Sequence, residues 1–106
     1  MRFGMSVNMD IPDAPRMAKR TLELLEGHEV LLEKGMASRF RTDGLLLEDM
    51  DVDIMVTVGG DGTILRALQH NKAPIFGINA GDLGFLTVVS EEELEEGVEN
   101  LLRGQY

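Results

Sequence analysis

The sequence contains no cysteine and no tryptophan, and it has only one tyrosine and four phenylalanines among its 106 residues. The lack of cysteine excludes disulfides, thiolate metal sites and cysteine nucleophiles. So few aromatic side chains offer no stacking platform for single-stranded nucleic acid. Cations are scarce too, because 10 Lys and Arg stand against 19 Asp and Glu, for a net charge of -9. We therefore expect no nucleic-acid partner, since such binding depends on clustered cations.

Long apolar runs are also missing. No run approaches the ~20 residues that a membrane-spanning helix needs, and the start, MRFGMSVNMD, lacks the apolar region of a signal peptide. We expect a cytoplasmic protein with no membrane partner. With 43% hydrophobic residues, residues 1–106 suit one domain with a modest core. The methionines are scattered like core filler. Neither the two histidines nor the aspartates outside the glycine-rich turn are expected to hold a metal, namely Asp10, Asp13, Asp49, Asp51 and Asp53.

Apolar segments alternate with helical patterns along the chain. Strands are expected over residues 1–7, 28–33, 54–58 and 73–78, and helices over 14–25, 64–70 and 91–102. Asp13 is expected to cap the first helix, and Ser90 with Glu93 has the spacing of a capping box before the last. Residues 34–44 are expected to form a loop, whereas 45–50 fit a short helix or a strand. The alternation predicts an α/β fold, an open parallel sheet with helices on both faces, as in Rossmann-like domains.

The segment DIMVTVGGDGTILRAL, residues 53–68, has the pattern of a buried strand, a glycine-rich turn and the start of a helix. In that context, backbone N–H groups at the end of a parallel strand can receive phosphate oxygens, and the helix dipole assists them. Gly59, Gly60 and Gly62 would permit positive φ and let a ligand approach the backbone. The segment matches neither the P-loop pattern nor GxGxxG.

Asp61 places a carboxylate among these glycines, where it would repel a phosphate. The amino end of a helix stabilises negative charge by about 0.3–1 kcal/mol. Toward a hydroxyl, Asp61 would accept the proton, and toward a polyphosphate it would bind the accompanying Mg²⁺. Phosphoryl transfer from a nucleoside triphosphate to an alcohol uses all these parts. The structural alternative is an aspartate that only caps a helix beginning at Ile64.

A second strand end carries polar residues. GINAGDLGFLT, residues 77–87, would bring Asn79 and the Gly81-Asp82 pair to the same sheet edge, so that two loops line one crevice. Asn79 suits a ribose or an adenine edge, or it only stabilises its own turn. Arg66, one helical turn beyond Thr63, is either a phosphate contact or a solvated surface residue.

VGGDGTILRAL, followed by PIFGINAGDLGFLT and an acidic helix, closely resembles the amino-terminal domain of NAD kinases. GGDGT alone is shared with 6-phosphofructokinases and with diacylglycerol and sphingosine kinases, whereas the stretch from Asn79 to Thr87 is typical of NAD kinases. The resemblance implies phosphorylation of the adenosine-ribose 2′-hydroxyl of NAD, which gives NADP. It implies ATP or polyphosphate as the donor, with Mg²⁺ carried by the donor.

The same resemblance implies that Asp61 is the catalytic carboxylate and also contacts NAD. The other implied nucleotide-binding positions are Gly62, Arg66, Gly59, Gly60, Thr63 and Asn79. NAD kinases are longer, with a second, β-rich domain, and assemble as homodimers or homotetramers. Because this chain stops at Tyr106, we expect the nucleotide-binding portion of such an enzyme, weakly active or inactive alone. The alternatives are another GGDGT-type sugar or lipid kinase, and a noncatalytic module that senses nucleotides.

Overall fold

The computed structural model describes residues 1–37, 44–80 and 89–104. Its strands are β1 (Arg2–Val7), β2 (Glu29–Leu32), β3 (Ile54–Gly59) and β4 (Ile75–Asn79). Its α-helices are α1 (Ala14–Leu24), α2 (Lys34–Ala37), α3 (Asp61–His70) and α4 (Leu94–Leu102). Two short 3₁₀ helices, η2 (Leu47–Asp49) and η3 (Glu91–Glu93), precede β3 and α4.

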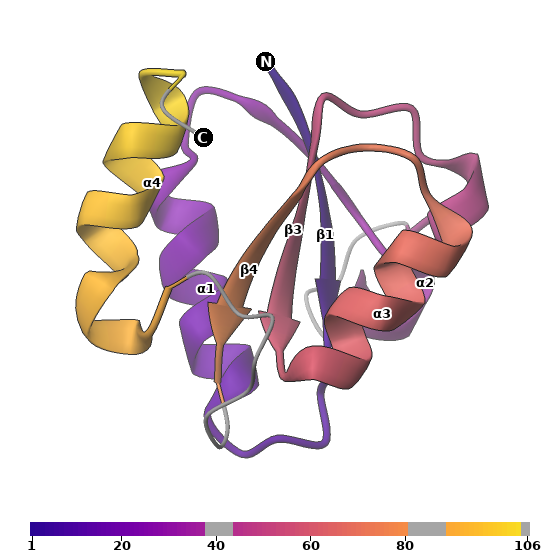
Figure 1. The fold of residues 1–106 in the computed structure, drawn as a ribbon, viewed down its shortest axis with the longest axis horizontal. Helices are drawn as coiled ribbons and strands as arrows, with labels where there is room; N and C mark the ends of the chain where they lie inside the picture. Colours follow the sequence, from indigo (N-terminus) through magenta and orange to yellow (C-terminus); the bar gives the residue numbers. More distant parts are fainter. Residues whose placement is uncertain (38–43, 81–88, 105–106) are drawn as a thin grey trace.

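The strands form one sheet in the order β2-β1-β3-β4, and every neighbouring pair is parallel. Figure 1 shows α1 and α4 on one side of the sheet and α3 on the other. The expected α/β fold, an open parallel sheet with helices on both faces, is therefore confirmed.

Alternation along β3 explains why both faces of the sheet are covered. Val56 belongs to a buried cluster that joins the sheet to Met17 of α1 and Val98 of α4. Its neighbour Met55 belongs to a second buried cluster, with Ala67 of α3. Successive side chains of a strand point to opposite faces, so a continuous apolar run requires helices on both sides.

The segment after β2 differs from the expectation. Residues 34–37 form the short helix α2 where a loop was expected, and residues 38–43 of that expected loop lie outside the described part. The segment 45–50 combines both alternatives, because Leu45 forms a parallel bridge with Glu33 and residues 47–49 form η2. That bridge extends the sheet edge by a single residue pair.

The end of α1 and the start of the last helical segment follow their expected signals. Gly27 adopts a φ of 94° just beyond α1, and Ser90 forms a capping box with Glu93, whose carboxylate accepts the Ser90 N–H at 3.2 Å. Asp13 holds the N-cap position of α1, as expected, but its side chain makes no capping hydrogen bond. Asp13 has a nearly helical backbone, with φ -87° and ψ -10°, whereas capping needs an extended residue. Its carboxylate lies 3.7 Å from Arg16 instead.

The strand order reverses direction between β1 and β3. From β1 the chain first adds β2 on one side, and then crosses to add β3 and β4 on the other. At such a switch point, the loops that follow the two neighbouring strands lead away in opposite directions, which leaves a crevice at the carboxyl ends of the strands. In Figure 1 the arrowheads of β1 and β3 lie at the lower edge, where α3 begins.

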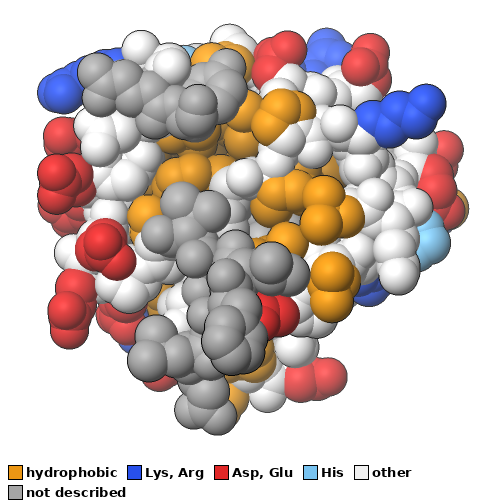
Figure 2. Space-filling view, in the orientation of Figure 1, with side chains coloured by type: hydrophobic (Ala, Val, Ile, Leu, Met, Phe, Trp, Pro, Cys, Tyr) orange, Lys and Arg blue, Asp and Glu red, His pale blue; other side chains and the backbone are white. Residues whose placement is uncertain are grey.

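The surface viewed in Figure 2 has acidic side chains around its margin and apolar side chains over its middle. Leu65 and Leu68 of α3 are 48% and 54% exposed. The side of α3 that faces away from the sheet is therefore partly apolar.

Candidate functional site

A cavity of about 670 Å³ opens at the switch point between β1 and β3. Residues 7–11, at the end of β1 and in the loop after it, line one side, and residues 33–35, after β2, line another. The glycine turn and α3 contribute Gly60, Gly62, Thr63 and Arg66. Four of the predicted site residues therefore share one cavity, in the place where open α/β sheets bind ligands.

Gly59 is required by the packing of strand against helix. A Cβ atom at this position would lie 2.4 Å from Oγ1 of Thr63 and 3.2 Å from Cβ of Asn8. Thr63 is itself buried, 8% exposed. Thus Gly59 lets the first turn of α3 approach the ends of β3 and β1, and its role in the fold is structural.

Gly60 and Gly62 lie next to open space. A Cβ atom on either would meet nothing within 4 Å, and both residues line the cavity. The expected positive φ is wrong for this turn, because Gly27 and Gly104 are the described glycines with positive φ. Gly60 is extended, with a φ of -116°, and β3 passes directly into α3. Because Gly60 and Gly62 have no side chains, a ligand in the cavity can reach their backbone N–H groups.

Asp61 is the first residue of α3, so the helix begins three residues before the expected Ile64. The alternative in which Asp61 only caps a helix at Ile64 is therefore wrong, since Gly60 holds the N-cap position. The Asp61 side chain is partly buried. Asp61 does not line the cavity itself but lies between two residues that do. The helix dipole stabilises its negative charge at this position.

Arg66 is held by two buried groups that the sequence analysis did not identify. Its Nη1 donates to Oε1 of Glu33 at 3.0 Å and to Oγ of Ser6 at 3.3 Å, while Nη2 donates to Oε2 of Glu33. Ser6 in turn donates to Oε1 of Glu33 at 2.7 Å. Ser6 is fully buried and Glu33 is 8% exposed. The one feature of the sequence that could have indicated this cluster is Glu33 itself, a charged residue directly after the apolar run of β2.

Burial of the Glu33 carboxylate acts to raise its pKa, but hydrogen bonds from Arg66 and Ser6 and the Arg66 charge outweigh it. The pKa of Glu33 therefore lies below its usual value. Glu33 is ionised in both the folded and unfolded states above the unfolded pKa, so its full contribution to stability is present there. That contribution is lost as the pH falls through the lower folded pKa.

We therefore expect the free energy of unfolding to fall as the pH drops below about 5, the upper limit of glutamate titration. Glu33→Gln should be less stable at pH 7 but should lose less stability on acidification. Urea denaturation at pH 7 and pH 4 measures both. The variant Glu95→Gln is the control, because it removes an exposed carboxylate paired with Arg20, and it should lose less stability at pH 7 than Glu33→Gln, since exposed ion pairs contribute little. A Glu33→Gln curve parallel to that of the wild type would contradict the assignment.

Asn79 lies beside the glycine turn but lines a different cavity. It is the register partner of Gly59 in the β3–β4 pairing, and the next residue, Ala80, donates its N–H to the Gly59 carbonyl at 3.0 Å. The expected adjacency of the two strand ends is confirmed. The cavity that Asn79 lines, of about 520 Å³, also contains Asp13 and Ser90. Residues 81–88, which include Asp82, lie outside the described part.

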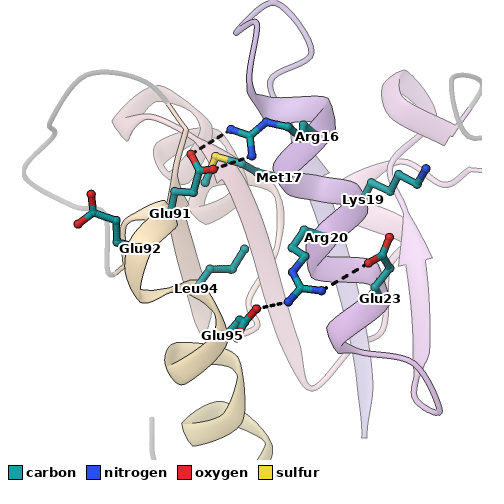
Figure 3. Close-up of a pocket in the computed structure, with 9 residues that line it drawn as sticks. All are labelled: Arg16, Met17, Lys19, Arg20, Glu23, Glu91, Glu92, Leu94 and Glu95. Carbon is teal, nitrogen blue, oxygen red and sulfur yellow. Dashed lines mark hydrogen bonds and ion pairs between the residues drawn. The ribbon is translucent and has the colours of Figure 1, made fainter.

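A third cavity, of about 460 Å³, lies between α1 and α4 (Figure 3). Arg16 binds Glu91 through two hydrogen bonds of 2.6 and 3.0 Å, and Arg20 pairs with Glu95 and Glu23. All these side chains are about half exposed. Because its arginines are matched by carboxylates, this surface joins two helices and offers little net charge to an anion.

Among residues 1–37, 44–80 and 89–104, no group of three or more His, Cys, Asp or Glu is placed to hold a metal ion. Within the same residues, no helix has the length and apolarity needed to cross a membrane.

Comparison with known families identifies the group to which these features belong. A family model described as the ATP-NAD kinase N-terminal domain matches residues 4–106. The chain belongs to the NAD kinase family. The NAD kinase of Methanopyrus kandleri is 41% identical over 112 residues, which cover 97% of this chain and 40% of that protein. The NAD kinase of Thermoplasma acidophilum is 35% identical over 107 residues, which cover 100% of this chain and 39% of that protein.

Solved NAD kinase structures share the fold. An NAD kinase from Archaeoglobus fulgidus in complex with ATP matches with a TM-score of 0.69 and 32% identity, over 98% of this chain and 38% of that one. Yeast NADH kinase complexed with NADH matches with a TM-score of 0.77 over 99% of this chain and 38% of that one, and at 18% identity it shows the fold alone. The chain spans about 40% of the length of the curated NAD kinases it matches.

Proposed function

We propose that the protein carrying this chain transfers the γ-phosphoryl group of ATP to the 2′-hydroxyl of the adenosine ribose of NAD, giving NADP. The observation that carries the proposal is the start of α3, where a single carboxylate, Asp61, lies between two glycines with open space beside them. Membership of the NAD kinase family supports it, as does the ATP in the Archaeoglobus fulgidus relative.

In this reaction Asp61 would accept the proton of the ribose 2′-hydroxyl. The 2′-oxygen then bonds to the γ-phosphorus, the bond from that phosphorus to the β,γ-bridging oxygen breaks, and ADP leaves. The backbone N–H groups around Gly60 and Gly62 and the positive end of α3 would hold the donor's phosphates. Arg66 would bind phosphate from the wall of the same cavity.

Mg²⁺ is expected with the phosphate donor. Mg²⁺ commonly binds one or two carboxylates together with phosphate oxygens and water, so a single carboxylate near the phosphates would be enough for a metal that arrives with its nucleotide. The sequence suggested only a loop role for Asp10, but Asp10 is the one carboxylate besides the paired Glu33 that lines the cavity, and its side chain would hold the ion. The ion would neutralise charge on the phosphates.

We also propose that the chain is the nucleotide-binding part of a longer enzyme and has little activity alone. It covers about 40% of its relatives, and loss of an orienting surface can lower a rate by about 100-fold. The homo-oligomeric state and the cytoplasmic location that we expected from the sequence stay predictions.

Product analysis of the complete protein tests the proposal. With ATP and Mg²⁺ we expect NAD to be converted to NADP, and inorganic polyphosphate in place of ATP shows whether it also serves as donor. Fructose 6-phosphate and diacylglycerol, the acceptors of other GGDGT kinases, should remain unmodified. Phosphorylation of either one without that of NAD would favour the wider kinase group. Binding of ATP or NAD without turnover would favour a noncatalytic nucleotide sensor.

A further inference from the structure

We propose that Glu33 and Ser6 are positioning residues that hold the guanidinium of Arg66 on the cavity wall, as a preorganised donor to the phosphates of the nucleotide. The inference rests on the proposed function, because it concerns how the same cavity binds its phosphate donor. It adds two residues that lie outside the GGDGT sequence.

The arrangement joins three separate elements. Ser6 comes from β1, on the face of the sheet opposite to the cluster that contains Phe3 and Met5. Glu33 directly follows β2, where its N–H donates to the Met5 carbonyl at 3.0 Å. Arg66 comes from the second turn of α3. Because β1 and β2 fix the two acceptors, the position of the guanidinium is set by the sheet.

The guanidinium keeps donors for a ligand. Its hydrogen bonds to Glu33 and Ser6 use Nη1 and Nη2, whereas arginine has five N–H donors. The Nε–H and a second hydrogen on Nη2 are not used by these contacts. The Arg66 side chain is 51% exposed, while the Glu33 side chain is 11% exposed, and both line the cavity. The acid thus lies deeper than the cation that it holds.

Two opposing effects decide the direction of the prediction. Pairing with Glu33 cancels the net charge of Arg66, which weakens its long-range attraction for phosphate. Pairing also restricts a side chain that would otherwise lose much rotamer freedom when it binds a ligand. Screening beyond about 8 Å at physiological ionic strength removes only the long-range part of this attraction. For a phosphate in direct contact with Arg66, we expect the gain from an oriented guanidinium to outweigh the repulsion from Glu33, so that removing Glu33 weakens binding.

The test compares ATP binding by the complete protein and its variants, by calorimetry in 0.15 M salt. Glu33→Gln keeps the shape of the side chain but loses its charge, and we expect about tenfold weaker ATP binding, the size of a charge-assisted hydrogen bond. Arg66→Ala should weaken binding at least as much. The double variant should bind no more weakly than Arg66→Ala alone, because Glu33 acts through Arg66.

Glu95→Gln is the matched control. It removes one carboxylate of an arginine pair that joins two other elements, α1 and α4, and its ATP affinity should equal that of the wild type. Inorganic tripolyphosphate is a second probe, and Glu33→Gln should weaken its binding by the same factor as for ATP. In steady-state assays Glu33→Gln should raise KM for ATP more than it lowers kcat. If Glu33→Gln does not fold, as judged by circular dichroism, Ser6→Ala replaces it, with a smaller loss expected.

Wild-type ATP affinity in the folded Glu33→Gln variant would show that the cluster only stabilises the fold and would overturn the proposal. So would additive losses in the double variant, or a loss for ATP that is absent for tripolyphosphate. Failure of the unsubstituted protein to bind ATP at all is a different outcome, because it refutes the proposed function from which this inference starts.

Discussion

Asp61→Asn is expected to lower kcat for NAD phosphorylation by about 10²–10⁴-fold, the usual contribution of a positioned general base. Asparagine is nearly isosteric but cannot accept the ribose proton, so the fold and the open space at Gly60 and Gly62 should persist. KM should change less than kcat, because the loss arises in the transition state. Initial rates of NADP formation by the complete protein, with thermal unfolding measured in parallel, provide the result.

Asp53→Asn is the matched control for this experiment. Asp53 immediately precedes β3, at the amino end of the strand whose carboxyl end leads to Asp61. Its carboxylate accepts the backbone N–H of Arg2 at 2.8 Å, on the surface. The variant removes one negative charge at the opposite edge of the sheet and should keep wild-type turnover. If Asp61→Asn also turns over normally, Asp61 is not the proton acceptor and the proposed mechanism fails.

Alanine at Gly59 and alanine at Gly62 are expected to have opposite effects on the free energy of unfolding. Gly59→Ala introduces a Cβ atom against Thr63 and Asn8. Rotation of the Thr63 side chain would move Oγ1 away but would leave the close approaches to the Cβ atoms of Thr63 and Asn8, so we expect a loss of about 1–3 kcal/mol, as for other overpacked sites. Urea denaturation measures this loss.

Gly62→Ala should stabilise the fold by up to about 1 kcal/mol, because alanine is the better helix former and the new Cβ meets no other atom. The same methyl group occupies the cavity surface, so the variant should bind ATP more weakly although it is more stable. The two variants therefore distinguish a glycine needed for packing, Gly59, from a glycine needed for ATP binding, Gly62. Unchanged ATP affinity in Gly62→Ala, or unchanged stability in Gly59→Ala, would contradict the roles assigned here.

Local sequence patterns were sufficient where short-range physics decides the structure. The apolar run before the glycine turn predicted β3 because a strand buried on both faces has no polar side. Ser90 and Glu93 predicted their capping box from spacing alone. Such signals failed at the start of α3, because three consecutive polar or small residues, Asp61, Gly62 and Thr63, have the composition of a loop yet continue the helix.

The glycines show a second limit of sequence patterns. Three glycines in one turn suggested positive φ, yet none adopts it. Each glycine is explained by its neighbours in space. Gly59 lies against Thr63 and Asn8, whereas Gly60 and Gly62 face open space. Neighbours in space are not visible in the local sequence, so the reason for each glycine could not be predicted.

By itself, the sequence determined the alternation of strands and helices, the exclusion of cysteine chemistry and the resemblance to NAD kinases, because these depend on composition and on residues close along the chain. Only the tertiary structure decided that Arg66 meets Glu33 and Ser6, which lie 33 and 60 residues away. It also decided that Asn79 and the glycine turn line different cavities. Such pairings follow from strand order and register, which bring distant residues together only when the whole sheet has formed.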